Sequence, residues 1–354
     1  MKEVLGDIER WRARGDRIAL ATVIATRRSA PRPTGSKLAI SERGEMAGSV
    51  SGGCVENEVY GQAREILAGA EPQLFSYGIS DDDAFAVGLP CGGEIDVFVE
   101  APSDELLARL AKVVERNERA VLFTVVEGEG AGRQLLVTAD GERVGEGPDE
   151  QFEEVLRGGR NVLLDLESGQ KVFAEVYGPP PRLLVFGAVD TAEALCRAAK
   201  QIGWRTIVSD ARGKFATPDR LPSADELVVA WPDEALDRVR PDDQTAVVVL
   251  THDERFDVPA LKGALETEAF YVGALGSRRN QARRRERLLE EGVEQAELER
   301  ISGPSGLDIG AETPAETALS ILAEILAARA GRDGGKLKES SGRIHAERPE
   351  PARR

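Results

Sequence analysis

The sequence predicts an α/β protein, in which an N-terminal α+β domain precedes a C-terminal doubly wound parallel sheet. Helical and strand patterns mix without regular order up to residue 103, whereas short apolar strands alternate with helical patterns beyond residue 181. Such alternation is typical of βαβ units. Between these regions lies Gly178-Pro-Pro-Pro181. Since successive prolines cannot join a helix or a central strand, we expect a domain boundary there.

The N-terminal α+β domain is expected over residues 1–103. Its first helix, 3–14, has an amphipathic pattern that places Val4, Ile8 and Trp11 on one face. Apolar, β-branched runs predict strands, and a second helical pattern starts directly after Cys54. The expected strands are 18–25, 37–40, 74–77 and 94–99, and the second helix is expected to end near residue 68.

Residues 104–178 are expected to form a connecting helix and a β-meander. The helix is predicted over 104–117, and a helical insert lies near 150–157. Alternating apolar and polar residues favour antiparallel strands. These strands are expected at 120–126, 133–138 and 171–177.

The C-terminal domain is expected over residues 179–331. Thr313 should cap its last helix, with Pro314 at the first helical position and Glu316 completing a capping box. Residues 332–354 contain almost no large apolar side chains and are expected to be disordered. The parallel strands are expected at 183–186, 206–208, 226–230, 246–250 and 270–272.

The composition favours a cytoplasmic protein that binds neither nucleic acid nor membranes. The 354 residues carry a net charge of −16, which opposes binding to anionic polymers and lipid surfaces. The N-terminal residues do not show the basic start followed by an apolar core that is typical of a secretory signal. No apolar run is long enough to cross a bilayer. Three cysteines without paired spacing argue against a disulfide framework or a zinc site.

Two short motifs place a cysteine beside paired glycines. Glycine allows backbone N–H groups to close on a ligand while the sulfur stays exposed beside it. Cys54 also precedes a predicted helix, whose dipole favours a thiolate and bound anions, although Glu56 would disfavour a neighbouring thiolate. The motifs predict a pocket for an anionic cofactor with sulfur chemistry nearby. They consist of Gly52, Gly53 and Cys54, and of Cys91, Gly92 and Gly93.

A structural interpretation of these motifs stays open, because free cysteines are usually buried as small hydrophobes and Gly-Gly pairs often mark plain turns. Cys196 lies inside a helical pattern, so we interpret it as a core residue.

Positive charge, which an anionic ligand requires, gathers in two places. These are a loop with Arg27, Arg28, Arg32 and Lys37, and a helix with Arg278, Arg279, Arg283, Arg284, Arg285 and Arg287.

The start of the C-terminal domain meets half of a dinucleotide fingerprint, which predicts a Rossmann-like fold. Gly187 follows the first strand, but Val189 stands where a glycine would let the backbone approach a pyrophosphate. Asp210, at the end of the second strand, is placed to bind a ribose diol. Dinucleotide binding therefore stays open.

Two further candidates follow later strands of the same domain. His252 comes after the fourth strand, where it could act in acid–base chemistry, contact a phosphate, or simply form a local hydrogen bond. Arg278 and Arg279 follow a glycine-containing turn and open a helix, which suits a phosphate or an acidic surface. The alternative is a solvated helix whose arginines pair with Glu286, Glu290 and Glu291.

Taken together, these motifs resemble the XdhC/CoxI family, the accessory proteins of xanthine dehydrogenase and related molybdenum hydroxylases. The resemblance covers roughly residues 10–330. Many relatives look like Gly-Ala-Gly-His where this chain has Gly187-Ala-Val-Asp190. The matching segments are 51–56, 89–93, 186–188, 210–212, 250–253, 271–279 and 306–314.

The resemblance implies a chaperone that binds molybdenum cofactor, supports its sulfuration by a cysteine desulfurase, and delivers it to an apo-hydroxylase. We also expect a homo-oligomer, with no metal ligands and no catalytic residues of its own. An NAD(P)-dependent oxidoreductase and a protein-docking scaffold are the alternatives. The candidate cofactor-binding residues are Gly52, Gly53, Cys54, Glu56, Cys91, Gly92, Gly93, Gly187, Asp210, His252, Arg278 and Arg279.

Overall fold

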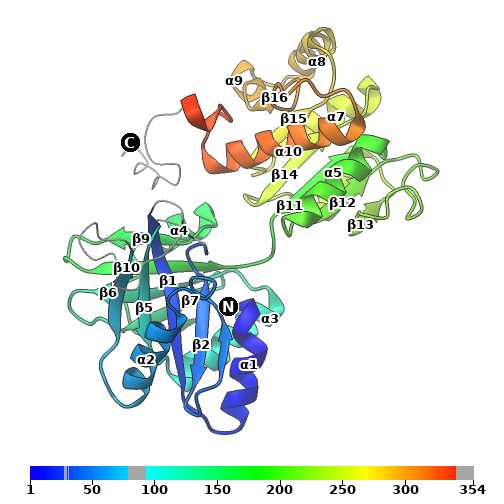
Figure 1. Cartoon of the computed structure of the whole chain (residues 1–354). Coiled ribbons are helices and arrows are strands. Elements are labelled where there is room, and N and C mark those ends of the chain that lie inside the picture. The colour runs from blue at the N-terminus through cyan, green and yellow to red at the C-terminus, as the bar shows by residue number, and fades with distance from the viewer. Residues whose placement is uncertain (28–29, 31, 79–92, 340–354) are drawn as a thin grey trace. The chain divides into compact units, whose positions relative to one another are not determined.

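A computed structural model of the chain describes residues 1–27, 30, 32–78 and 93–339 (Figure 1). The described chain divides into two compact units between Pro179 and Pro180. Cys91, Gly92 and most of the predicted disordered tail lie outside the described residues. Residues 332–339 are described and include a short 3-10 helix, Leu337–Glu339.

The N-terminal unit contains two antiparallel sheets. The first has the order β3-β2-β1-β5-β4 and the second β8-β7-β6-β10-β9. The strands of the first sheet are β1 (Ile18–Arg27), β2 (Lys37–Ser41), β3 (Met46–Gly48), β4 (Gln73–Tyr77) and β5 (Glu94–Glu100). Those of the second are β6 (Ala120–Glu127), β7 (Gln134–Thr138), β8 (Arg143–Gly145), β9 (Val162–Asp165) and β10 (Lys171–Tyr177).

Side chains from both sheets pack together in the middle of this unit. Ile24 and Phe98 of the first sheet form one buried cluster with Val126 and Phe173 of the second. Helices cover the remaining apolar surface: α2 packs on the first sheet and α4 on the second. Burial on both faces explains why β1 is an almost continuous apolar run. The helices are α1 (Lys2–Ala13), α2 (Glu56–Leu67), α3 (Asp104–Arg116) and α4 (Phe152–Gly158).

The second sheet is not the simple meander that the sequence predicts. β10 pairs with β6, so the third predicted strand lies beside the first instead of extending the order beyond β7. The added strands β8 and β9 occupy the edges. Both are short and contain no buried residue, so they lack the apolar periodicity on which strand prediction depends.

The C-terminal unit is a six-stranded parallel sheet with the order β13-β12-β11-β14-β15-β16. This doubly wound order confirms the predicted fold class. β16 was not predicted, because two residues carry no periodic signal. The strands are β11 (Arg182–Phe186), β12 (Arg205–Ser209), β13 (Glu226–Val228), β14 (Thr245–Val249), β15 (Tyr271–Ala274) and β16 (Ile301–Ser302).

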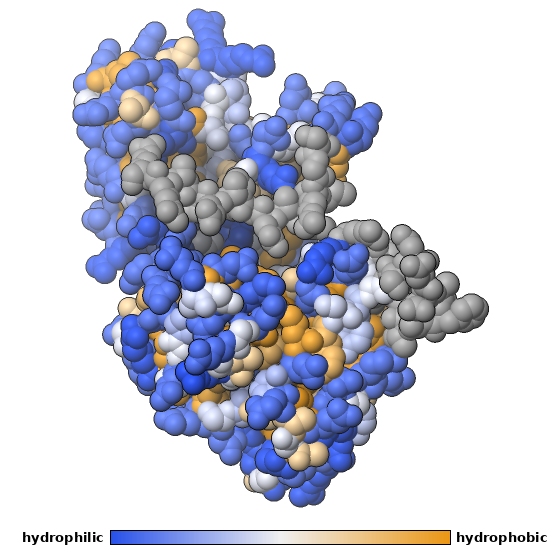
Figure 2. Space-filling model, turned by 90° about the vertical axis from the view of Figure 1, so that its left-hand side faces the viewer, coloured by the Kyte–Doolittle hydropathy of each residue, from blue (hydrophilic) through white to orange (hydrophobic). Residues whose placement is uncertain are grey.

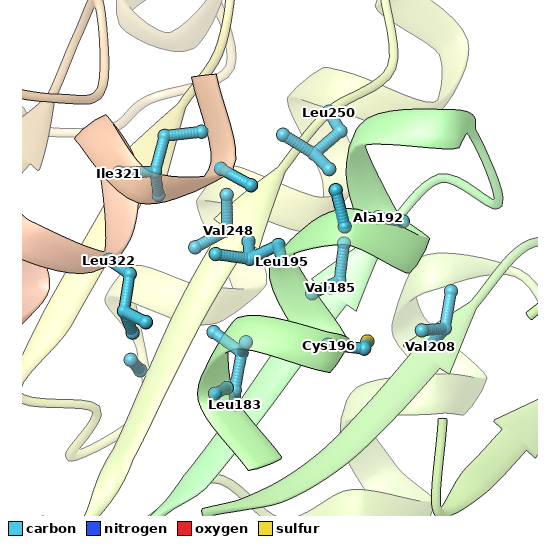
Figure 3. Close-up of a cluster of buried hydrophobic side chains, with 14 of the residues drawn as sticks. Leu183, Val185, Ala192, Leu195, Cys196, Val208, Val248, Leu250, Ile321 and Leu322 are labelled. Carbon is cyan, nitrogen blue, oxygen red and sulfur yellow. The ribbon is translucent and has the colours of Figure 1, made fainter. Parts of the chain in front are cut away.

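Helices cover both faces of this sheet. On one face, α5 and α10 enclose a cluster that includes Leu183, Leu195 and Ile321 (Figure 3). Cys196 is fully buried in that cluster, as expected, and burial raises the pKa of its thiol to about 12. The opposite face packs against α6, α7 and α8. The helices are α5 (Asp190–Gln201), α6 (Pro232–Val239), α7 (Glu254–Leu265), α8 (Arg278–Glu290), α9 (Gln295–Leu298) and α10 (Pro314–Ala330).

One prediction about the last helix of this unit is confirmed. Thr313 and Glu316 form the predicted capping box at the start of α10, and Gly331 ends the helix in the left-handed conformation.

No helix among the described residues is long and apolar enough to cross a membrane. The face shown in Figure 2 is mostly hydrophilic, with hydrophobic residues visible as smaller patches between the hydrophilic ones.

Candidate functional site

The segment 49–55, here called the Cys54 loop, connects β3 to α2 and closes around the Glu56 carboxylate. The hydroxyls of Ser49 and Ser51 donate to this carboxylate at 2.6 and 2.5 Å. The backbone N–H groups of Val50, Ser51 and Gly53 donate to it at 3.2, 3.0 and 2.8 Å. The loop is therefore built as an anion nest, and the chain's own carboxylate occupies it.

This arrangement changes the interpretation of the glycine motif. Burial raises the pKa of Glu56, but the hydrogen bonds from Ser49, Ser51 and the backbone outweigh burial and lower it to about 2. Glu56 is thus a permanent carboxylate at neutral pH. In this conformation the Gly53 N–H donates to Glu56 and the Gly52 N–H donates to the Ser49 hydroxyl oxygen, so an incoming anion would have to displace these acceptors to use the two donors. The role of these residues in cofactor binding stays a prediction.

Gly52 and Gly53 are exposed and have φ angles of 80° and 113°. A Cβ atom at either position would meet nothing within 4 Å, so the backbone conformation requires glycine there and crowding does not. Cys54 is a free cysteine, half-buried, and packs against the core between α2 and the first sheet. Its backbone N–H donates to the Ser51 hydroxyl oxygen at 2.9 Å. The loop therefore fixes the Cys54 backbone and leaves part of the residue accessible.

The second cysteine motif is described only at Gly93, which is buried just before β5. The basic loop of the same unit provides no free cation among its described members. Arg27 pairs with Asp96, Arg32 with Glu3, and Lys37 with Glu175, each at 2.8 Å. Arg28 lies outside the described residues.

A cavity of about 370 Å³ in the N-terminal unit is a feature that the sequence did not indicate. Lys37, Asn161, Glu175 and Tyr177 are among its lining residues. Lys37 and Glu175 come from different sheets and are both about 95% buried. A lysine and a glutamate so far apart in sequence carry no local signal that they will meet, which is why sequence analysis missed this pair.

At the start of the C-terminal unit, Gly187 lets the β11–α5 turn approach the end of β14. Its φ is 109°, and a Cβ atom there would lie 2.7 Å from the Thr251 side chain. Val189 packs against the core cluster under α5. Asp190 is exposed at the first position of α5, where its negative charge opposes a bound pyrophosphate. The usual phosphate position of this fold is therefore altered in both shape and charge.

Asp210 is also committed to contacts within the protein. One carboxylate oxygen accepts hydrogen bonds from the Ala188 backbone and the Arg212 guanidinium, at 2.9 and 2.8 Å. The other oxygen accepts from the Arg212 backbone and side chain, both at 2.9 Å. Burial raises the pKa of Asp210, but these bonds outweigh burial and lower it. Four bonds fill a carboxylate, so none remains for a ribose diol.

The arginine-rich helix α8 divides its charges between the interior and the solvent. Arg284 is buried and donates to the Asp257 carboxylate at 2.5 Å and to the Thr251 and Leu275 carbonyls at 2.9 and 2.7 Å. It thereby ties together the loops that follow β14 and β15. Arg283 pairs with Glu254 of α7 at 2.8 Å. The expected partner Glu290 pairs with Arg287, at 2.6 Å.

Arg278, Arg279 and His252 remain exposed at the carboxyl edge of the sheet. Within the part of the chain that the structure describes, Arg278 and Arg279 form no ion pair, so they are available to an anionic ligand. His252 lies in the loop between β14 and α7. The fold thus places Gly187, Asp210, His252 and the start of α8 along one edge, where this class of sheet binds ligands.

Comparisons with known proteins agree on one family. The model of the XdhC and CoxI family matches residues 11–78, and that of the XdhC Rossmann domain matches residues 183–325. A Bacillus subtilis protein, named as a probable subunit of xanthine dehydrogenase, is 30% identical over 313 residues, 88% of this chain and 92% of that protein. The molybdenum cofactor insertion chaperone PaoD of Escherichia coli is 27% identical over 89% of this chain and 84% of its own length.

A solved structure is similar over nearly the whole length. The crystal structure of a Bacillus halodurans protein, described as a xanthine dehydrogenase, superposes with a TM-score of 0.66. It is 25% identical and covers 95% of this chain and 97% of the solved chain. The matching models, the identity over most of both chains and the shared fold place this protein in the XdhC and CoxI family.

Proposed function

We propose that this protein is a maturation factor for molybdenum hydroxylases of the xanthine dehydrogenase type. It binds molybdenum cofactor as cargo, holds it while a cysteine desulfurase supplies the terminal sulfido ligand, and delivers it to the apo-hydroxylase in the cytoplasm. The observation that carries the proposal is the similarity, over most of both chains, to a relative named as a cofactor insertion chaperone.

The residues of each unit support this role separately. In the N-terminal unit, Cys54 presents a half-buried free thiol on a loop held rigid by Glu56. Thiolates are favoured ligands and neighbours of soft metal–sulfur centres. In the C-terminal unit, Arg278 and Arg279 offer guanidinium groups at a helix start, which suits the phosphate of the pterin.

Cofactor retention tests the proposal directly. The protein is produced in a host that makes molybdenum cofactor, and molybdenum and pterin are measured per chain after purification. We expect both to copurify, and we expect retention to rise when cofactor is supplied. An empty protein under both conditions contradicts the proposal.

The cysteines provide matched variants for this measurement. Cys54→Ser should lower retention about tenfold, or ~1.4 kcal/mol, on the order of one charge-assisted contact. Cys196→Ser should leave retention unchanged, because Cys196 is buried in the core of the other unit, and should cost about 1 kcal/mol of stability. If Cys54→Ser retains as much cofactor as the parent, the Cys54 loop is a structural turn and the proposed contact is wrong.

Delivery and sulfuration require separate measurements. Loaded protein is mixed with cofactor-free hydroxylase, and the appearance of hydroxylase activity is followed with and without a cysteine desulfurase and free cysteine. We expect hydroxylase activity to appear only when the loaded protein and the cysteine desulfurase are both present. Size-exclusion chromatography with light scattering tests the proposed homo-oligomer in the same samples.

The alternative, an NAD(P)-dependent oxidoreductase, rests on the parallel sheet of the C-terminal unit. Val189, Asp190 and the fully bonded Asp210 oppose it, because they alter the pyrophosphate position and occupy the ribose acceptor. Calorimetry with NAD(H) and NADP(H) decides between the two functions. Micromolar binding together with substrate-dependent nicotinamide oxidation would favour the oxidoreductase.

A further inference from the structure

Three aromatic rings and two guanidinium groups adjoin one another at the carboxyl edge of the C-terminal sheet, and neither the sequence motifs nor the proposed function accounts for them. The Trp231 and Phe256 rings are stacked at 4.8 Å with an interplanar angle of 23°. The Arg212 guanidinium lies 5.9 Å from the Phe256 ring centre and 4.4 Å from that of Phe215. Arg220 lies 4.9 Å from the Phe215 ring. We call these five residues the aromatic stack.

The members of the stack come from loops and helix starts that follow three different strands. Arg212 and Phe215 follow β12, Trp231 precedes α6 after β13, and Phe256 lies in the first turn of α7 after β14. Asp210 holds the plane of Arg212 through two bonds to its guanidinium. A parallel α/β sheet binds its ligands at this edge. The stack is therefore positioned where a ligand is expected, and Asp210 fixes the orientation of Arg212 at its centre.

The stack is also open to solvent at a place where large apolar side chains are usually buried. Trp231 is 49% exposed and Phe215 is 37% exposed, and the neighbouring Val229 is 50% exposed. The other two tryptophans of the chain, Trp11 and Trp204, are buried. An indole that is supported on one face by Phe256 and half exposed offers a surface on which another flat ring can stack.

We propose that the aromatic stack binds the fused heteroaromatic ring of a purine nucleotide or a pterin by extending the stack at Trp231. Ring stacking of this kind tolerates different bases, because every base has a flat π-face. Because Asp210 has no free acceptor, the ring is recognised and the ribose is not. This mode differs from dinucleotide binding, in which the acidic residue after the second strand holds the ribose. The purine form of the proposal does not depend on the proposed maturation function.

Trp231 makes the proposal measurable in the full-length protein. Tryptophan fluorescence and calorimetry are recorded during titration with AMP, dAMP, NAD⁺ and 6-carboxypterin. We expect saturable quenching by AMP or by the pterin. Whichever of the two binds more tightly shows whether the ligand is a purine nucleotide or a pterin. AMP and dAMP should bind equally, and NAD⁺ no more tightly than AMP.

Three variants define the control set, with calorimetry as the common readout. Trp231→Leu removes the ring and should weaken binding about tenfold or more, whereas Trp231→Phe keeps a ring and should retain binding. Ile202→Ala removes a comparably exposed apolar side chain at the end of α5 and should have no effect.

Three results would overturn the inference. The first is the absence of binding by every ring tested, and the second is equal binding by Trp231→Leu and the parent. The third is a preference for AMP over dAMP of tenfold or more, which would show that Asp210 recognises ribose. Molybdenum and pterin content is measured on the same preparations, so a failure of ring binding is distinguished from a failure of the maturation proposal.

Discussion

The Glu56 carboxylate is the anion around which the Cys54 loop folds. Five donors from Ser49, Val50, Ser51 and Gly53 converge on it, and it sits at the first position of α2. A carboxylate also suits a helix N-terminus. The loop therefore has a preformed shape before any ligand arrives, and this shape depends on one side chain.

Replacing Glu56 tests that dependence. Glu56→Gln keeps one acceptor but turns an amide N–H₂ toward donors, so we expect a loss of about 1–2 kcal/mol after allowing for partial exposure. The control is Glu65→Gln, an exposed position on the same helix. Chemical denaturation measures both changes.

The pH dependence of Glu56 supplies a second readout. Because its pKa is lowered from 4.5 to about 2, the folded state gains stability that is fully present above pH 4.5 and is lost as the pH falls toward 2. The parent should lose this component in that window, and Glu56→Gln should lack it. Parallel stability–pH curves for the two proteins would contradict the assignment.

Arg284 and Arg279 belong to the same helix, but substitution should cost much more stability at Arg284 than at Arg279. Arg284 and its partner Asp257 are 4% and 2% exposed, so Arg284→Ala leaves a buried carboxylate without its cation and should cost about 3–5 kcal/mol. Arg279→Ala changes a solvated residue and should alter stability by less than about 0.5 kcal/mol. Thermal unfolding of the two variants measures the difference. Comparable losses would mean that Arg284 is not a structural anchor.

At the scale of elements, the two sheets of the N-terminal unit enclose a group of ionisable side chains. Lys37 of β2 pairs with Glu175 of β10, and Glu100 of β5 accepts a hydrogen bond from Gln134 of β7 at 2.9 Å. Burial raises the pKa of Glu100 to about 8, the Lys37 charge lowers it in part, and the Glu175 charge adds to the increase. Glu100 is therefore mainly protonated at neutral pH.

This raised pKa predicts a loss of stability with increasing pH. Between pH 4.5 and about 8 the folded state binds a proton that the unfolded state has released, so the free energy of unfolding falls as the pH rises through this range. Glu100→Gln keeps an acceptor for Gln134 and cannot ionise. It should be more stable than the parent at pH 8, by about 1 kcal/mol or more, and should show no such advantage at pH 4.5. Denaturant titrations at the two pH values provide the test, and an equal difference at both would contradict it.

At the scale of the whole molecule, the chain is two compact units with different architectures. The division between Pro179 and Pro180 coincides with the run of prolines. Each unit has its own buried clusters, with α2 and α4 covering sheets in one and α5 to α8 with α10 covering the sheet in the other. Units with separate cores commonly fold alone.

Separate production of the units tests this independence. We expect residues 1–179 and residues 180–339 each to give a soluble protein with its own cooperative unfolding transition. The core variant Cys196→Ser should shift only the transition of the second unit. A fragment that unfolds without cooperativity would show that its core requires the other unit.

Local sequence signals determined the parallel half of the fold and both of its clear boundaries. The segments 183–186 and 246–249, in β11 and β14, are fully apolar, because helices cover both faces of the sheet, and the capping box that begins at Thr313 spans only four residues. The prolines mark the division between the units because they exclude regular backbone hydrogen bonding. These properties depend on neighbouring residues alone, so they can be predicted from the sequence.

Tertiary structure decided which polar groups are already engaged. Nothing local indicates that Asp210 spends all its acceptors on Ala188 and Arg212, or that Lys37 meets Glu175 across two sheets. The aromatic stack likewise joins residues from three loops. Burial and hydrogen bonding depend on distances between chain segments, and the sequence specifies these only through the folded core. The candidate residues could thus be named from the sequence, but their availability to a ligand could be judged only from the structure.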